Sequence, residues 1–312
     1  MPKVLVSGST AIDLIGAYSG SYLDHAGVEA LNVSLQLSSL ATSFGGCAMN
    51  IAYGLNALGV EAIPLSVVGA DFRDRYEKYL AGLGINIDNV VIDDSVEHGA
   101  MGIMTSDCDG NQITLFYPGA DGSKLRKFPR DVVGITDCQL AIVAPEGAPI
   151  MLHHARDLQS LGIPAIFDPG QCLPEFSKQE VNELLDLCQY TIVNEYEIDM
   201  LLKISDLSQQ AVIDICEWLI VTKAAVGVDI FIDGQCHHIP STKINEILDP
   251  TGCGDAFRVG LIYGMTKDCS AIDCARYGNL VAARNLTSIN TQNYKLNARQ
   301  LEAEFVASYS GS

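Results

Sequence analysis

Short, continuous apolar runs recur along the chain, separated by segments with helical periodicity. Most of these runs do not alternate with polar residues, which is typical of parallel strands covered on both faces. The runs that predict buried strands are 3–9, 63–69, 139–145, 164–170, 190–195 and 218–224. The amphipathic segments that predict helices are 47–58, 71–83, 149–161 and 178–188. This alternation predicts an α/β fold with a doubly wound, mostly parallel sheet flanked by helices.

Two stretches interrupt this rhythm and predict a second, smaller sheet. The first stretch, 11–45, contains no convincing helix, and its segment "LNVSLQLSS" alternates like a strand with one solvent-facing side. The second stretch, 97–120, has the pattern of a β-hairpin with its turn at Asp107–Asn111. The alternative is that both stretches are edge strands of the main sheet. The predicted boundaries are 1–10, 46–96 and 121–312 for a large α/β domain, and 11–45 and 97–120 for a small β lid.

Composition narrows the class of protein. The chain has 312 residues, of which 48% are hydrophobic, and this suffices for a full core. Its 19 basic and 38 acidic residues give a formal net charge of −19. Such a chain repels nucleic acid and anionic lipid, so we expect neither as a partner. Phosphate groups would have to be bound locally, by backbone N–H groups, a few cations or a metal.

Targeting signals and cysteine usage indicate a cytoplasmic protein. The start "MPKVLVSGSTAIDLIG" lacks the pattern of a signal peptide, and no apolar run reaches the about 18 residues that span a membrane. The ten cysteines form no C-x-x-C pair, and several lie inside apolar runs. Free thiols in a reducing compartment fit this distribution better than disulfides or a zinc site.

The stretch "DPTGCGDAF" at 249–257 carries the strongest chemical signal, because an apolar helical run follows it at once. A helix N-terminus offers unpaired N–H groups and the positive end of a dipole. Gly252 and Gly254 would let these groups converge on an anion, with Asp255 beside them as a proton acceptor. This pairing predicts phosphoryl transfer to an alcohol. The alternative is an ordinary helix cap. P-loop and Rossmann motifs are missing from the sequence.

"DPTGCGD" resembles the D-x-T-G-A-G-D signature of the ribokinase or PfkB-type carbohydrate and nucleoside kinases. The early Gly-Gly motif of this family matches "FGGCAMNIAYGLNALG" at 44–59. The two motifs occur in the family's order, and the resemblance extends over essentially the whole chain. It implies a ribokinase-like fold with a β-sheet lid and a kinase that uses ATP and Mg²⁺.

The resemblance also implies roles for the residues of the glycine turn. Asp255 would be the catalytic base, and Gly252, Cys253 and Gly254 would form the anion hole. Cys253 replaces the family's usual alanine, and a hole made of backbone donors should tolerate this change. Asp249 and Thr251 match positions that hold a monovalent cation, K⁺, in some family members. The alternative is that these two residues only cap the turn.

The acceptor pocket is implied by matches near the N-terminus. Asp13 matches the family aspartate that accepts hydrogen bonds from sugar hydroxyls, a task suited to the two oxygens of a carboxylate. Gly45, Gly46 and Asn50 would complete the substrate pocket. The alternative for Asp13 is a surface aspartate after the first strand.

The nucleotide site is implied by matches in the second half of the chain. Asn194 and Glu197 match an N-x-x-E segment near the phosphates and would hold Mg²⁺ through water. The alternative for both is a helix start with acidic residues placed to suit the dipole. The implied ATP-binding residues are Asn194, Thr222, Gly227, Gly252, Gly254 and Asn279. Ala224 stands where the family has a glycine, which puts nucleotide contact at that position in doubt.

Several features tilt the expected acceptor toward adenosine. Arg258 and Val259 after the glycine turn resemble the bacterial adenosine kinases of the family. Arg258 would either supply a cation for phosphate or neutralise Asp255. Phe116 and Tyr117 in the predicted hairpin would stack on a base, worth about 1–3 kcal/mol per base.

We therefore expect transfer of a phosphoryl group to the 5′-hydroxyl of adenosine, which gives AMP. A ribokinase-like or other sugar kinase is the alternative, and a non-catalytic nucleotide or metabolite sensor on the same fold is the second. The expected partner is a small nucleoside or sugar. The chain would be a monomer or a homodimer formed through the lid.

Overall fold

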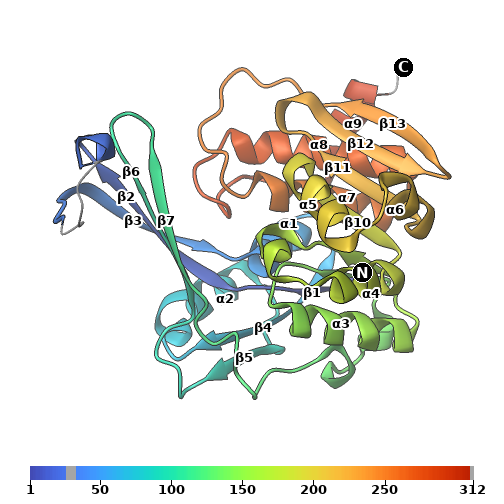
Figure 1. Cartoon of the computed structure of the whole chain (residues 1–312), viewed down its shortest axis with the longest axis horizontal. Helices are drawn as coiled ribbons and strands as arrows, with labels where there is room; N and C mark the ends of the chain where they lie inside the picture. The colour runs from blue at the N-terminus through green and yellow to red at the C-terminus, as the bar shows by residue number, and fades with distance from the viewer. Residues whose placement is uncertain (26–32, 310–312) are drawn as a thin grey trace.

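The computed structural model describes residues 1–25 and 33–309 and contains two separate sheets (Figure 1). A nine-stranded sheet carries helices on both faces, and a four-stranded sheet projects from one side of it. The α/β class and the smaller separate sheet predicted from the sequence are confirmed.

The large sheet is parallel except at one edge, where the pairings of β12 with β11 and β13 are antiparallel. From edge to edge its strands are β13 (Gln235–Pro240), β12 (Gly227–Ile232), β11 (Trp218–Thr222), β10 (Tyr190–Asn194), β9 (Ala165–Phe167), β8 (Leu140–Val143), β1 (Lys3–Ser7), β4 (Glu61–Gly69) and β5 (Val90–Asp93). Continuous apolar strands supply side chains to both faces. In β1, Val4 and Val6 join one core and Leu5 joins the other.

Helices cover both of these apolar faces. One core contains residues of α1 (Cys47–Ala57), α2 (Lys78–Leu83), α7 (Cys253–Met265), α8 (Ala271–Leu286) and α9 (Ala298–Tyr309). The other contains residues of α3 (Ala148–Leu161), α4 (Lys178–Leu187), α5 (Glu195–Ser205) and α6 (Gln209–Ile215). The sheet is therefore a middle layer whose strand ends stay open to receive a ligand.

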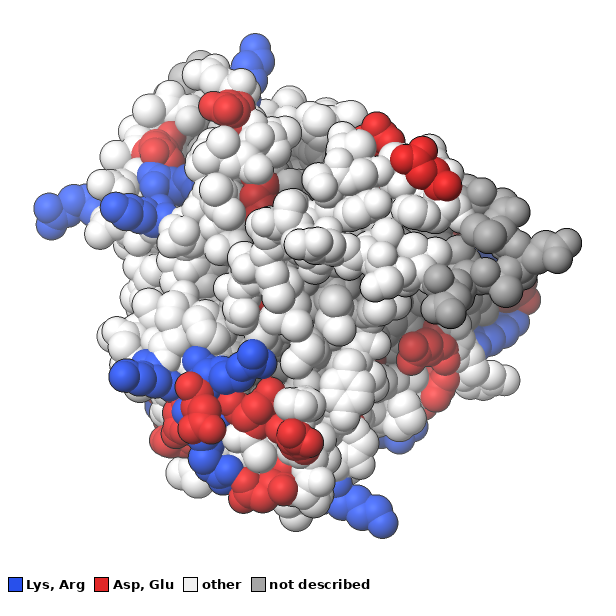
Figure 2. Space-filling view, turned by 90° about the vertical axis from the view of Figure 1, so that its left-hand side faces the viewer, with Lys and Arg blue, Asp and Glu red and all other residues white. Residues whose placement is uncertain are grey.

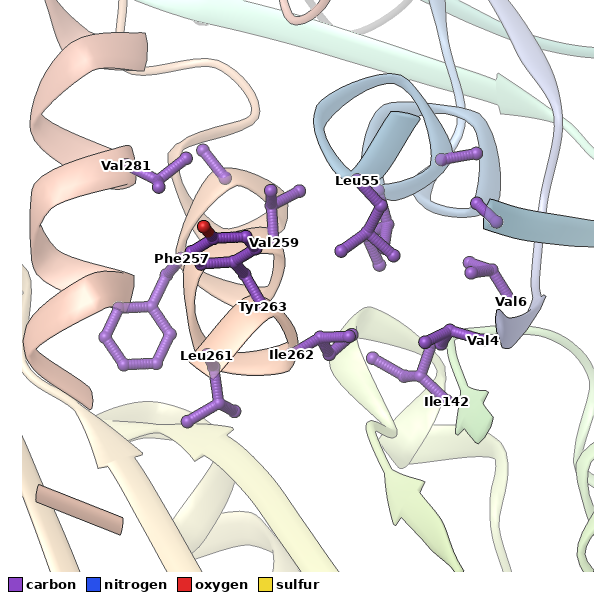
Figure 3. Packing of buried hydrophobic residues seen from close by; sticks show 14 of the residues in the cluster. Val4, Val6, Leu55, Ile142, Phe257, Val259, Leu261, Ile262, Tyr263 and Val281 are labelled. Carbon is purple, nitrogen blue, oxygen red and sulfur yellow. The ribbon is translucent and has the colours of Figure 1, made fainter. Parts of the chain in front are cut away.

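Most of helix α7, whose first turn reaches the site, is buried. Every residue from Ala256 to Gly264 is buried. Figure 3 shows its side chains reaching Val281 of α8 on one side and toward Leu55 of α1 and Ile142 of β8 on the other. This packing fixes the first turn of α7 at the carboxyl edge of the sheet.

The small sheet consists, in spatial order, of β3 (Leu37–Gly45), β2 (Ala11–Tyr18), β6 (Ala100–Ser106) and β7 (Gln112–Tyr117). Strands β2 and β6 are parallel, and the other two pairings are antiparallel. The register places Asp13, Gly102 and Phe116 in one row across three strands. Because successive residues face opposite sides, neighbours of these residues along each strand lie on the other face.

The hairpin predicted around Asp107–Asn111 is confirmed as the β6–β7 connection. Its turn is stabilised by the Asp107 carboxylate, which accepts the N–H groups of Asp109 and Asn111. The four strands form their own sheet, so the alternative of edge strands on the main sheet is wrong. The division into a large domain and a lid stays a prediction.

Other expectations needed correction. The strand expected over "LNVSLQLSS" begins only at Leu37, and part of the expected segment lies in 26–32, outside the described residues. The helix expected over 71–83 is a π-helical turn at Arg73–Glu77 followed by α2. The β12–β13 hairpin was not predicted.

All ten cysteines are free thiols, as expected. Across residues 1–25 and 33–309, no helix combines the length and apolar character needed to cross a bilayer. A cytoplasmic location stays a prediction.

Candidate active site

A cavity of about 350 Å³ lies at the carboxyl edge of the large sheet, beside the small sheet. Loops after β1, β8 and β9, the ends of β10 and β11, the starts of α1 and α7, and strands β2 and β7 supply its walls. The expected site residues that line it are Asp13, Gly46, Asn50, Asn194, Glu197, Thr222, Thr251, Gly252, Gly254 and Asp255. The cavity thus joins residues from both ends of the chain.

The glycine turn leads directly into α7. Gly252 has φ 75°, in the left-handed region that favours glycine, and a Cβ atom there would lie 2.8 Å from Cγ2 of Thr291. Gly254 and Asp255 follow in the first helical turn, where N–H groups have no acceptor within the helix. Any anion at this end of the cavity meets these amides and the positive end of the helix dipole.

The Cys253 amide does not point to an anion site as the expected anion hole requires. Its amide donates to the Pro250 carbonyl oxygen at 3.2 Å, because the tight turn folds that N–H back toward the preceding loop. Its side chain helps line a second cavity rather than the first. The anion-hole prediction therefore depends on the amides of Gly252 and Gly254.

Asp255 is held from one side. Asn50 Nδ2 donates to Asp255 Oδ2 at 2.7 Å, while Oδ1 has no hydrogen-bond partner among the described residues. Burial raises the pKa of Asp255 to about 6, against the hydrogen bond from Asn50 and the positive charge of Arg258. The carboxylate is therefore a proton acceptor matched to near-neutral pH, with one oxygen available to a ligand.

Asp13 reaches the cavity from the small sheet. Cβ atoms built at Gly45 and Gly102 would lie 2.3 Å and 2.5 Å from its two carboxylate oxygens. Burial raises the pKa of Asp13 to about 6, and a hydrogen bond from the Gly102 amide opposes this shift. Gly45 does not line the cavity; it leaves the room that the Asp13 carboxylate occupies.

The second glycine of the early motif starts helix α1. Gly46 has φ 88°, and a Cβ atom there would lie 2.4 Å from the Ser9 carbonyl oxygen. Its own carbonyl accepts the amide of Asn50, one turn into α1, at 2.9 Å. Asn50 therefore lines the cavity because Gly46, whose backbone conformation needs glycine, sets where α1 begins.

Only one of the two expected lid aromatics faces the cavity. Phe116 lies in the same row of the small sheet as Asp13 and lines the cavity. Tyr117, the next residue, faces the opposite side and is 46% exposed. The prediction that both rings stack on a base is therefore wrong for Tyr117.

A second cavity of about 470 Å³ adjoins the first and shares Asn194, Thr222 and Gly254 with it. Of the other residues expected at ATP, Gly227 and Asn279 also line it, whereas Gly252 lines only the first cavity. Ala224 lines this cavity despite the missing glycine, at a φ of 45°. Asn279 is buried and donates to the Pro240 carbonyl oxygen at 2.9 Å.

Asn194 and Glu197 form a reciprocal cap at the start of α5. The Glu197 amide donates to Asn194 Oδ1, and the Asn194 amide donates to Glu197 Oε2, both at 2.8 Å. Among the described residues, no group of three or more His, Cys, Asp or Glu could hold a metal ion. Mg²⁺ bound largely by water and phosphate needs fewer protein ligands, and Oε1 of Glu197 is open for one such contact.

Asp249 anchors the glycine turn to a distant segment. Its Oδ1 accepts the Thr251 amide and its Oδ2 accepts the Asn290 amide, both at 2.9 Å. These contacts correspond to the turn-capping alternative. A monovalent cation at Asp249 and Thr251 stays a prediction.

Arg258 forms an ion pair that the sequence did not reveal. Its guanidinium binds both carboxylate oxygens of Asp168, at 2.5 Å and 2.6 Å, and Nη1 donates to the Gly254 carbonyl oxygen at 3.1 Å. Asp168, which follows β9, is 1% exposed. The partner of Arg258 is thus Asp168 and not Asp255. The one available signal for Asp168 was a carboxylate directly after an apolar strand.

Together these residues place the Asp255 carboxylate in the first cavity, beside the first turn of α7, where Gly254 lines both cavities. A hydroxyl-bearing ligand in the first cavity would face Asp13, Asn50 and Asp255. An anion that extends from the second cavity would meet the amides of α7. This arrangement suits transfer of a phosphoryl group from one cavity to the other.

Known proteins resemble this chain in sequence and architecture over nearly their full length. The sequence model of the pfkB family carbohydrate kinases matches residues 1–298. The nucleoside kinase of Methanocaldococcus jannaschii is 30% identical over 287 residues, which cover 91% of this chain and 90% of that protein. Its solved structure matches with a TM-score of 0.89 at 27% identity and covers 99% of each chain.

A second relative was solved with ligands. The structure of Burkholderia thailandensis nucleoside kinase in complex with inosine matches with a TM-score of 0.88 at 31% identity, over 98% of this chain and 99% of that one. The structure of the same protein in complex with ADP-inosine matches with a TM-score of 0.85 at 32% identity, over 98% and 96% of the two chains.

Proposed function

This chain belongs to the pfkB family of carbohydrate kinases and is an ATP-dependent kinase, and we propose that it phosphorylates the 5′-hydroxyl of a nucleoside. The family and the ribokinase-like fold expected from the two glycine motifs are confirmed. The observation that carries the proposal is the position of Asp255. It lines the first cavity directly after Gly254, which lines both cavities, and one of its oxygens has no hydrogen-bond partner among the described residues.

Adenosine is the acceptor that we propose first. Phe116 on the cavity wall offers an aromatic face for a base, and the features around Arg258 resemble adenosine kinases. Inosine is the second candidate, because a relative with 31% identity was solved in complex with inosine. Both ligands carry the same ribose, so the contacts proposed below apply to either.

In the proposed mechanism, Asp13, Gly46 and Asn50 hold the ribose. Asp255 accepts the proton of the 5′-hydroxyl as the hydroxyl oxygen attacks the γ-phosphorus of ATP, and the bond from that phosphorus to the bridging oxygen breaks, so that ADP leaves. The amides of Gly252 and Gly254 stabilise the charge on the moving phosphoryl group. Closure of the small sheet as a lid would exclude water, which otherwise competes with the acceptor.

ATP would occupy the second cavity, with its contacts at Asn194, Thr222, Gly227 and Asn279. Mg²⁺ would be held through water by Glu197 and would offset phosphate charge that this acidic chain otherwise repels. We retain K⁺ at Asp249 and Thr251 as part of the proposal. Replacing K⁺ by choline in the assay would show whether turnover depends on this ion.

An ADP-release assay with a panel of nucleosides and free sugars tests the acceptor. We expect release that depends on a nucleoside and is greatest with adenosine or inosine. Turnover with ribose or fructose alone would favour the sugar-kinase alternative. Nucleotide binding with no turnover on any acceptor would favour a sensor.

The variant Asp255→Asn tests the base directly. Because the amide cannot accept the hydroxyl proton, we expect kcat to fall about 100- to 10,000-fold while ATP still binds. Asp199→Asn, at an exposed carboxylate of α5, is the matched control and should keep wild-type turnover. Unchanged kcat in Asp255→Asn would remove the assigned base.

We also propose that a second copy of the chain docks on the outer face of the small sheet. The register places one set of apolar side chains opposite the row of Asp13 and Phe116. We define the outer face by Leu14, Leu40, Ile103, Ile113, Leu115 and Tyr117. Asp13 is the only charged residue in the four strands, and it faces the cavity. Figure 2, which views the molecule from the side of the small sheet, shows charged side chains near the margins and an uncharged middle.

A further inference from the structure

Gln292, in the segment after α8, forms hydrogen bonds that reach the active site without lining its cavity. It is 5% exposed. Its Nε2 atom donates to Asn50 Oδ1 at 2.8 Å and to the hydroxyl oxygen of Tyr76 at 2.5 Å. Asn50 in turn donates to Asp255. One side chain therefore connects helix α1 and Asp255 to the π-helical turn at Arg73–Glu77, just before α2.

The groups at the two ends of this hydrogen-bonded chain, Tyr76 and Asp255, determine which atoms in it donate and which accept. The Tyr76 hydroxyl donates to the Gly45 carbonyl oxygen at 3.1 Å, so its oxygen can only accept from Gln292. Both hydrogens of the Gln292 amide are then used. Asn50 must direct its oxygen toward Gln292 and its NH₂ group toward Asp255.

We propose that Gln292 is a positioning residue that fixes the orientation of the Asn50 carboxamide. In that orientation Asn50 occupies Oδ2 of Asp255 and leaves Oδ1 free for the acceptor hydroxyl. The reverse orientation would place the Asn50 oxygen against the carboxylate, where two acceptors repel. The catalytic part of this inference rests on the proposed function, whereas the orientation of Asn50 does not.

The backbone around Gln292 is anchored by contacts that do not involve its side chain. The Tyr79 hydroxyl donates to the Gln292 carbonyl oxygen at 3.0 Å, and the Tyr53 hydroxyl donates to the Tyr294 carbonyl oxygen at 2.8 Å. The hydroxyl of Thr291 donates to the Phe44 carbonyl oxygen at 2.8 Å. Replacing the Gln292 side chain should therefore release Asn50 without releasing the segment.

Gln292→Met and Gln292→Glu test the inference. Methionine keeps the length and removes both donors, so we expect kcat to fall about 3- to 10-fold, the equivalent of one lost hydrogen bond. Glutamate, when ionised, repels Asn50 Oδ1 and favours the reversed amide, so the loss should exceed that of Gln292→Met. The effect should be on kcat more than on the KM for ATP.

Titration of Asp255 by NMR in the protein without ligands gives a readout that needs no turnover. The reversed or mobile amide no longer donates to Asp255, so its titration should move to higher pH in both variants. A shift in Gln292→Glu alone would reflect only the added charge and would overturn the inference. The acid side of the kcat/KM profile should move with the titration.

Tyr79→Phe is the matched control, because it removes an anchor of the same segment without altering the donors to Asn50. It should leave kcat and the Asp255 titration at wild-type values. Equal losses in Tyr79→Phe and Gln292→Met would show a merely structural role. A wild-type chain inactive on every acceptor, with Asp255 still shifted in both variants, would refute the proposed function and not the orientation of Asn50.

Discussion

Asp13 and Asp255 line one cavity, and burial raises the pKa of both to about 6. The proposed function needs each in its ionised form, Asp13 to accept hydrogen bonds from hydroxyls and Asp255 to accept a proton. Neither can relax into solvent, because glycines enclose the first and Asn50 holds the second. The ionised forms of these two buried carboxylates therefore lower the stability of the fold, which is typical of residues in functional sites.

The pH profile of kcat/KM should report this pair. Protonation abolishes both roles, so activity should fall as pH drops below about 6, with a slope steeper than one proton if both groups contribute. The profile should be measured from pH 5 to 9 at saturating Mg²⁺, which suppresses protonation of ATP. A rate that stays constant from pH 5 to 7 would contradict the assignment of Asp255 as the base.

Asp13→Asn should stabilise the protein at alkaline pH while it weakens the acceptor site. The folded chain retains the Asp13 proton up to about pH 6, whereas the unfolded chain ionises near pH 4. Stability from this group is thus present at low pH and is lost as pH rises through 6. We expect a gain of about 1–3 kcal/mol in the free energy of unfolding at pH 8 and a smaller gain at pH 5.

Urea unfolding at both pH values would measure this difference. The exposed Asp109 in the β6–β7 turn provides a control, since Asp109→Asn should change stability at neither pH. A loss of stability in Asp13→Asn at pH 8 would mean that the ionised carboxylate is well solvated or paired in the folded chain.

Sequence patterns located residues that lie in motifs and missed those defined only by tertiary contact. The glycine turn and the early Gly-Gly motif identified Asp255, Asn50 and Gly46 because local backbone geometry dictates them. Asp168 and Gln292 lie outside any motif, and the distances of 90 and 242 residues to their partners could not be read from one sequence.

At the scale of elements, close helix packing positions the glycine turn. A Cβ atom at Gly260 of α7 would lie 2.2 Å from the Tyr277 carbonyl oxygen of α8. The two helices therefore approach closely because this position has no side chain. The sequence predicted α7 itself but gave no sign of which helix it would contact.

Gly260→Ala should destabilise the fold, because backbone atoms at that distance cannot move aside. We expect a loss of about 1–3 kcal/mol in the free energy of unfolding, measured in urea, and a lower kcat as the turn with Asp255 shifts. Gly82→Ala in α2 is the matched control: a Cβ there meets nothing within 4 Å, so it should stabilise by about 0.5–1 kcal/mol. Equal stability of the two variants would show that α7 and α8 can separate at no cost.

Elements whose apolar and polar residues follow one clear pattern were predicted well. Elements with a mixed pattern were not. The buried strands of the large sheet are continuous apolar runs, and the hairpin at Asp107–Asn111 has strong turn chemistry. Strand β2 contains an aspartate, and β13 is mostly exposed, so neither shows a periodic signal that competes with other assignments.

At the scale of the whole molecule, the two sheets divide the work of the site. Helix α7 and the turn before it, at the edge of the large sheet, supply the amides and the proposed base, and the small sheet supplies Asp13 and Phe116. Both faces of the small sheet carry apolar residues, and several of those on the outer face are largely exposed. Leu40, Ile113, Leu115 and Tyr117 there are 63%, 47%, 60% and 46% exposed.

An apolar face of this kind seldom stays free in a soluble monomer, and a two-fold partner would cover it with an identical face. We expect the chain to form a dimer in size-exclusion chromatography with light scattering. Leu115→Glu would bring two carboxylates into the apolar contact and should give monomers. Val133→Glu, at a residue 97% exposed outside the small sheet, should leave the dimer intact. A wild-type chain that is monomeric at tens of micromolar would refute the contact, and a dimer that survives Leu115→Glu would place it on another face.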